Sequence, residues 1–278
     1  AGRATGSAAA RAPPRVSPPP EPAGTAGGTA PTELSTVYEG GTVMSAPKVA
    51  IVTGASRGIG AGVVEGYRKL GYAVVATSRS IGPSDDPQVL TVAGDLAEPG
   101  TADRVVDAAL DRFGRIDSLV NNAGAFLAKP FTAYTDEDFA TVVGLNLAGF
   151  FGITRRAVAP MVERGSGHVV TITTSLVDHA LSVVPSVLAA LTKGGLDAAT
   201  RSLAIELAAT GVRVNALSPG IIKTPMHPVE AHGAYAGLHP LGRMGEIDEI
   251  VHGVMYLETA AFVTGETLHV DGGQSAGH

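Results

Sequence analysis

The chain has 278 residues and 45% hydrophobic content, which is enough to bury one substantial core. The net charge of −6, the lack of a basic run in the globular part and the lack of a membrane-length apolar run argue against nucleic-acid and membrane partners. Because the chain has no cysteine, disulfides, thiolate nucleophiles and cysteine-ligated metal sites are excluded. The absence of cysteine fits a reducing cytosol, although it fits any other compartment as well, and we expect a cytoplasmic protein.

Residues 1–43 differ in composition from the rest, being rich in Ala, Pro, Gly, Ser and Thr without a strand or helix period. Such a segment has too little apolar surface to offset its ordering entropy, so we expect a disordered leader or tag. Its three arginines are also compatible with a transit peptide, but three glutamates offset their charge. We favour Met44 as the natural start, which leaves residues 44–278 as one domain.

The pattern changes at Pro47. The run Lys48–Thr53 is short, apolar and β-branched, which is typical of a strand buried on both faces. A glycine-rich turn, a helix over Ile59–Leu70 and a strand over Tyr72–Thr77 complete a right-handed βαβ unit. Further strands, with helices between them, are predicted over Val89–Val92, Ser118–Asn121, His168–Thr173, Val212–Leu217 and Thr267–Val270. This alternation predicts an α/β fold: a single-domain, doubly wound (Rossmann) parallel sheet with helices on both faces.

The turn Thr53–Gly60 follows a strand and opens a helix, which is the context of a dinucleotide-binding loop. Gly54 permits a tight turn, and Gly58 and Gly60 let the backbone approach a pyrophosphate at the helix N-terminus. The other members of the turn expected at the cofactor are Ser56, Arg57 and Ile59.

The end of the second strand bears on the choice of dinucleotide. An acidic residue there would bind the ribose 2′-hydroxyl of NAD, but the chain reads Thr77-Ser78-Arg79. With Arg57 in the glycine turn, two guanidiniums can clamp the 2′-phosphate of NADP. We therefore expect NADP(H), with NAD(H) possible; the alternative is that both arginines are ordinary solvated surface residues.

Further motifs follow in a fixed order along the chain: Gly94-Asp95-Leu96, Asn121-Asn122-Ala123-Gly124, Asn146, Lys193, Pro219-Gly220 with Thr224, and Gly265 to Gly273. With these motifs, the chain from Pro47 to about Gly273 resembles the short-chain dehydrogenase/reductase family and is similar to its 3-oxoacyl-carrier-protein reductases. The resemblance implies an NADP(H)-dependent oxidoreductase that acts on a small-molecule carbonyl or alcohol substrate. It also implies a homo-oligomer, a dimer or tetramer, paired through helices around Asp138–Val162 and Ser186–Ala208.

The resemblance also implies cofactor contacts for the motifs beyond the glycine turn. Asp95 and Leu96 would hold the adenine, and the turn Asn122-Ala123-Gly124 would support the ribose. After Pro219 and Gly220, the backbone of Ile222 and the hydroxyl of Thr224 would hold the nicotinamide carboxamide.

The catalytic set of the family is Asn, Ser, Tyr and Lys. By resemblance, Lys193 would bind the nicotinamide ribose and lower the pKa of a neighbouring phenol, and Asn146 would anchor a water that relays protons. The serine position is open between Thr174, which matches by distance from the strand, and Ser175, which matches by residue type. The tyrosine is missing, because Ala189 stands four residues before Lys193.

Two side chains are candidates to replace the missing acid. His179, beside Asp178, lies in the loop Leu176–Pro185 after the predicted strand His168–Thr173. The segment from the serine position to Lys193 is about two residues longer than the family spacing, which predicts a reshaped loop there. Tyr235 lies in the segment Thr224–Leu241, which resembles the family's substrate lid. The lid histidines lack metal-ligand spacing, so no metal site is expected.

Three functional hypotheses remain open. The first is an oxidoreductase with an atypical proton donor, which we favour. The second is a catalytically impaired nucleotide-binding module or regulatory protein on the same fold. The third is an incidental loss of the tyrosine in an ordinary reductase, which a tyrosine at position 189 would reverse.

Overall fold

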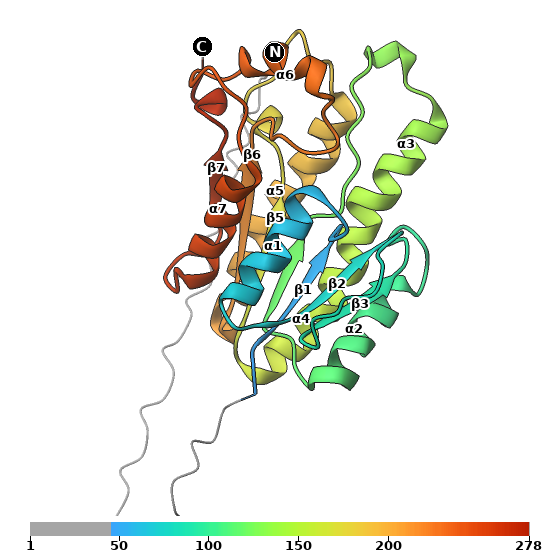
Figure 1. Ribbon diagram of the computed structural model, residues 1–278, viewed down its shortest axis with the longest axis vertical. Coiled ribbons are helices and arrows are strands. Elements are labelled where there is room, and N and C mark those ends of the chain that lie inside the picture. The colour runs from blue at the N-terminus through green and yellow to red at the C-terminus, as the bar shows by residue number, and fades with distance from the viewer. Residues whose placement is uncertain (1–45, 278) are drawn as a thin grey trace, which may run out of the picture. The chain divides into compact units, whose positions relative to one another are not determined.

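The computed structural model describes residues 46–277, and the predicted leader over residues 1–43 lies outside the described residues. The described chain forms one parallel sheet in the order β3-β2-β1-β4-β5-β6-β7 (Figure 1). The strands are β1 Val49–Thr53, β2 Ala73–Ser78, β3 Val89–Ala93, β4 Ser118–Asn121, β5 Gly167–Ile172, β6 Val212–Pro219 and β7 Thr267–Val270. The sequence prediction of a doubly wound parallel sheet is confirmed, and most strand ends agree to within one residue.

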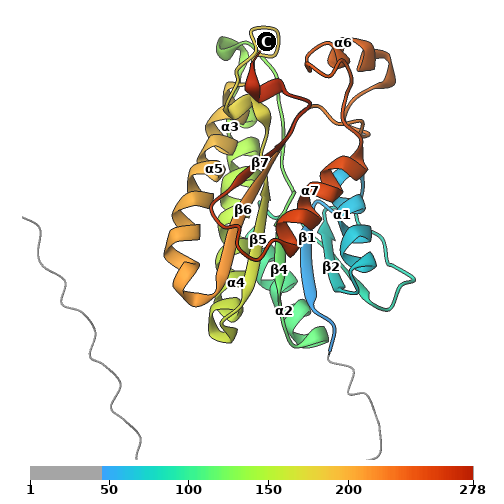
Figure 2. The same ribbon diagram turned by 90° about the vertical axis from the view of Figure 1, so that its left-hand side faces the viewer.

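Helices cover both faces of this sheet, as predicted. On one face lie α1 (Gly58–Lys69) and α7 (Ile247–Thr259), and on the other lie α2 (Thr101–Phe113), α4 (Phe150–Arg164) and α5 (Val187–Leu207) (Figure 2). Alternate residues of β1 enter the two cores: Ala50 and Val52 pack towards α1 and α7, whereas Val49 and Ile51 pack towards α2, α4 and α5. Burial on both faces explains why the strand reads as a continuous apolar run.

The helical segment before β5 is interrupted. It begins as α3 (Asp136–Val143), where Thr135 and Asp138 cap each other reciprocally. A π-helical turn over Gly144–Gly149 then widens the backbone before α4 continues. Such turns are frequent at functional sites, and this one carries Asn146.

A buried carboxylate joins α7 to the sheet near the amino ends of the strands. Glu258 accepts hydrogen bonds of 2.8 Å from the hydroxyls of Tyr67, Tyr72 and Ser118, and it pairs with His168 Nδ1 at 2.8 Å. Burial alone would raise the pKa of Glu258, but the hydrogen bonds from His168 and the two tyrosines outweigh it and lower the pKa to about 2. Burial lowers the pKa of His168 and so favours the neutral imidazole. This network stabilises the end of the sheet opposite the candidate site.

The strand order reverses between β1 and β4, which places a crevice at the carboxyl ends of the strands. The short helix α6 (His232–Ala236) lies at this same end, as Figure 1 shows. The fold therefore brings the loops after the strands and the predicted lid together.

Candidate functional site

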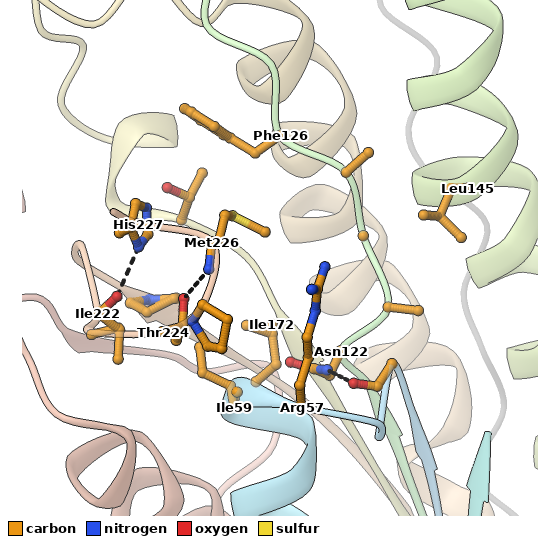
Figure 3. Close-up of a pocket in the computed structure, with 18 of the residues that line it drawn as sticks. Arg57, Ile59, Asn122, Phe126, Leu145, Ile172, Ile222, Thr224, Met226 and His227 are labelled. Atoms are coloured by element: carbon orange, nitrogen blue, oxygen red, sulfur yellow. Dashed lines mark hydrogen bonds between the residues drawn. The ribbon is translucent and has the colours of Figure 1, made fainter. Parts of the chain in front are cut away.

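A cavity of about 870 Å³ occupies this crevice, and the loops after β1 to β6 line it (Figure 3). A volume of this size is in the range of cofactor and ligand sites. Of the residues predicted to hold the cofactor, all except Gly60 line the cavity, from Gly54 in the first turn to Thr224 at the lid. The sequence motifs therefore converge on one place, although they span most of the chain.

The glycines of the first turn have no side chains, and this leaves room for a phosphate beside the backbone. Gly58 has a φ of +59°, in the left-handed region that favours glycine. A Cβ on Gly60 would lie 2.2 Å from the carbonyl oxygen of Gly54, so helix α1 packs against the turn more closely than any side chain would allow. Arg57, at the N-cap of α1, makes no side-chain capping bond, so the first N–H groups of the helix remain available to an anion.

Hydrogen bonds lock the first turn to the loop after β4. The hydroxyl oxygen of Thr53 accepts from the backbone N–H groups of Asn122 and Ala123 at 3.0 and 2.9 Å. The amide nitrogen of Asn122 donates to the carbonyl oxygens of Thr53 and Gly54 at 2.9 and 3.2 Å. The side chain of Asn122 thus fixes the shape of the cavity wall, which the sequence motif alone did not reveal.

The wall at the end of β2 carries donors without a partner. Among the described residues, the buried hydroxyls of Thr77 and Ser78 have no hydrogen-bond partner. Both residues line the cavity, together with the exposed side chains of Arg57 and Arg79. Unpaired buried hydroxyls beside two guanidiniums and an open helix N-terminus fit an anionic dinucleotide. The residues present therefore fit the nicotinamide dinucleotide that the sequence predicts.

At the opposite end of the cavity, side chains of the segment after β6 hold the backbone of that segment in place. His227 Nδ1 bonds the carbonyl oxygen of Ile222 at 2.8 Å, and the hydroxyl of Thr224 accepts from the N–H of Met226 at 3.4 Å (Figure 3). The buried His239 accepts from the N–H of Ile221 at 2.9 Å through Nε2. These bonds position the backbone of Ile222 and the hydroxyl of Thr224 at the cavity wall.

The two residues that match the family's catalytic set, Lys193 and Asn146, are placed differently. Lys193, on α5, lines the cavity, and its ammonium donates to the carbonyl oxygens of Thr173 and Ile172 at 2.9 and 3.5 Å. Burial of the ammonium lowers the pKa of Lys193 to about 8. The side chain of Asn146 is instead bonded to both backbone groups of Ala125, at 2.8 and 3.0 Å, and to Thr192 at 3.0 Å. Asn146 therefore holds the loop after β4 against α5.

The structure separates the two candidates for the serine position. Thr174 lines the cavity, whereas Ser175 is 1% exposed and donates its hydroxyl to Gln274 Oε1 at 2.7 Å. His179 does not line the cavity, and its neighbour Asp178 pairs with His269 at 3.0 Å. Thr174 and Lys193 thus line the same cavity, whereas Ser175 and His179 do not.

Ala189 is fully buried in α5 and does not line the cavity. The long loop before α5 contributes Val183 and Val184 to the wall. From the lid come Tyr235, which the sequence singles out, and His227, whose ring packs edge-on against Tyr235 at 5.3 Å between centroids. Sequence reasoning missed His227 and also Gln274, which directly follows the recognised Asp271-Gly272-Gly273 motif.

Metal sites and membrane-spanning helices were the two remaining questions for the part of the chain that the structure describes. Over residues 46–277, no cluster of three or more His, Cys, Asp or Glu side chains could hold a metal ion. Within the same range, none of the helices is both long and apolar enough to cross a bilayer.

Comparisons with known proteins agree with this geometry. The family described as Enoyl-(Acyl carrier protein) reductase matches residues 54–275. A putative ketoacyl reductase of the granaticin polyketide synthase from Streptomyces violaceoruber is 36% identical over 241 residues, which cover 81% of this chain and 95% of that protein. The 3-oxoacyl-[acyl-carrier-protein] reductase FabG of Escherichia coli is 32% identical over 241 residues, covering 81% and 96%.

Solved structures give the same result. ElxO with NADP bound superposes with a TM-score of 0.78 at 27% identity, covering 83% of this chain and all of that one. A 3-ketoacyl-(acyl-carrier-protein) reductase from Brucella melitensis complexed with NADH has a TM-score of 0.76 at 29% identity, covering 82% and 98%. Fold, site and relatives agree: the chain belongs to the short-chain dehydrogenase/reductase family of oxidoreductases.

Proposed function

We propose that the protein is an NADP(H)-dependent oxidoreductase that interconverts a carbonyl compound and an alcohol, with the ammonium of Lys193 as its proton donor. One observation carries this proposal: Lys193 reaches the cavity wall while position 189, where the family has its phenol, holds a buried alanine. Within the described residues, Lys193 has no carboxylate partner that would hold its proton.

The preference for NADP(H) rests on the end of β2. No carboxylate stands there to bind a ribose 2′-hydroxyl, and Arg57, Ser78 and Arg79 line the cavity together. Guanidiniums bind phosphate oxygens in charge-assisted, bidentate bonds. NAD(H) is the alternative, since relatives of known structure hold either NADP or NADH.

A nicotinamide held in this cavity would supply the hydride in reduction and accept it in oxidation. In the reductive direction, the hydroxyl of Thr174 donates a hydrogen bond to the substrate carbonyl oxygen and orients it. An ammonium has three N–H groups, of which two point to the carbonyl oxygens of Ile172 and Thr173. The third N–H of Lys193 gives its proton to the oxygen that becomes the alcohol; in oxidation the neutral amine takes that proton back.

The pKa of Lys193 suits this role. At about 8 it leaves the side chain mostly protonated at neutral pH, yet the proton is released more easily than from an ordinary lysine. General acid catalysis is most efficient when the pKa lies near the working pH.

Tyr235 is the competing donor, because it lines the cavity from the lid. Its ring contacts His227, and in the described part of the chain its hydroxyl makes no hydrogen bond to Thr174 or Lys193. The loop histidine His179 is less favoured because it does not line the cavity. Lys193 is therefore the donor that we propose.

NADPH consumption in the presence of a panel of ketones, aldehydes and quinones tests the proposal. We expect turnover with NADPH in preference to NADH, loss of turnover in Lys193→Met, and retention in Tyr235→Phe. Lys69→Met is the matched control, since Lys69 lies in the last turn of α1, away from the cavity. Tight NADPH binding without turnover of any substrate would instead support the nucleotide-binding module.

We also propose a homo-oligomer. Phe151 on α4 and Leu191 on α5 are 65% and 59% exposed, and the two helices cover the same face of the sheet. Pairing of these helices between two copies would cover them. Light scattering coupled to size exclusion tests this, and a monomer at micromolar concentration would contradict it.

A further inference from the structure

Gln274 is a buried amide with an unused donor. The residue is 1% exposed, its Oε1 accepts from Ser175 at 2.7 Å, and its amide nitrogen has no hydrogen-bond partner among the described residues. Gln274 also lines the large cavity. A buried N–H without a partner is costly, so a pocket that keeps one is suited to a ligand that accepts from it.

The position of Gln274 is fixed by its neighbours. Asp271, at the end of β7, accepts from the backbone N–H groups of Gly273 and Ser275 at 2.9 and 2.7 Å, and its carbonyl oxygen accepts from the N–H of Gln274 at 3.2 Å. These bonds close the 3₁₀ turn Gln274–Ala276. Together with Ser175, they hold the amide without help from a ligand, which lowers the ordering cost of binding one.

Apolar side chains also line this cavity. They include Phe126, Leu176, Val184 and Met226, and Figure 3 shows Phe126 above Met226 and His227. An apolar pocket with a few fixed polar groups selects its ligand through those groups.

We propose that the amide N–H of Gln274 binds a second oxygen acceptor of the substrate, one that is distinct from the reacting carbonyl. The inference rests on the proposed carbonyl chemistry, because the carbonyl oxygen has two lone pairs and Thr174 and Lys193 use both. The donor of Gln274 then needs another oxygen, such as that of an ester, thioester, amide or second ketone. The substrate class is accordingly an apolar carbonyl compound with two oxygen functions.

Two probes of the same chain length, ethyl acetoacetate and 2-heptanone, differ in the ester oxygens. The dissociation constant of each probe from the protein–NADP⁺ complex is measured by ligand-detected NMR. The ratio of the two constants gives the preference for the ester, and it does not depend on turnover. We expect Gln274→Met to lower the preference for the ester by about three- to tenfold, the value of one neutral hydrogen bond. Gln274→Glu keeps the acceptor for Ser175 but lacks the donor, and we expect it to lower the ratio as well.

Gln88→Met is the matched control, because Gln88 Oε1 is also buried without a partner but the residue does not line the cavity. Its ratio should equal that of the unaltered protein. A ratio unchanged in both Gln274 variants, or failure of the unaltered protein to bind the ester, would overturn the proposal.

Turnover of the same probes with NADPH separates this proposal from the reaction itself. Reduction of both probes with a ratio unaffected at Gln274 would keep the oxidoreductase and reject the second-acceptor site. A Gln274-dependent binding preference without reduction of either probe would keep the second-acceptor site and count against reduction of this substrate class by the protein.

Discussion

Restoring the tyrosine at position 189 should destabilise the protein and fail to restore ordinary catalysis. Ala189 is fully buried and outside the cavity wall, so the phenol has no space unless the loop before α5 moves. Overpacking a core position costs about 1–3 kcal/mol. We therefore expect Ala189→Tyr to lower the free energy of unfolding by about 2 kcal/mol in urea titrations.

The activity of the same variant decides between divergence and incidental loss. A correctly placed acid typically contributes about 10²–10⁴-fold to the rate, whereas we expect the kcat of Ala189→Tyr to rise by less than about tenfold. Ser202→Tyr, at an exposed position on α5, controls for the effect of a tyrosine on the helix and should leave stability unchanged. Unchanged stability together with a gain of about 10²-fold or more would refute the reasoning.

Two further predictions concern the buried carboxylate and the cofactor phosphate. Because the pKa of Glu258 falls from 4.5 to about 2 on folding, its charge stabilises the fold above pH 4.5, and about 3 kcal/mol is lost as the pH falls from 4.5 to 2. Urea titrations should show this loss of stability, and Glu258→Gln should lack it. A separate loss from His168 should begin as the pH falls below 6.5, because burial lowers the pKa of the imidazole in the folded protein. The double variant Arg57→Ala, Arg79→Ala should raise the Kd for NADPH about tenfold and leave that for NADH within about twofold, by fluorescence titration. Equal losses for both cofactors would contradict the phosphate assignment.

The sequence was sufficient to predict the fold because its signals are local. A strand such as β1 is buried on both faces and therefore reads as a continuous β-branched run, and the glycine turn after it has no room for side chains. Each motif also belongs at the carboxyl end of a strand, so the parallel sheet alone brings Gly54, Asn122 and Thr224 to one cavity.

The catalytic details depend on packing between segments distant in sequence, which local patterns do not encode. The sequence leaves the serine position open between Thr174 and Ser175. In the structure Ser175 is buried, donates its hydroxyl to Gln274, 99 residues away, and does not line the cavity. Asp178 likewise pairs with His269, on β7, and local sequence around Asp178 and His179 does not predict this distant partner. The side chain of Asn146 is engaged by Ala125 and Thr192, and no spacing rule predicts those partners.

The pH dependence of kcat in both directions tests the role of Lys193 most directly. With a pKa of about 8, we expect the reductive kcat to be constant below pH 8 and to fall about tenfold per pH unit above it, because the acid is lost. Oxidation needs the neutral amine, so its kcat should rise through the same pH, as a mirror image. A reductive kcat that stays constant to pH 10, or full activity in Lys193→Met, would contradict the account.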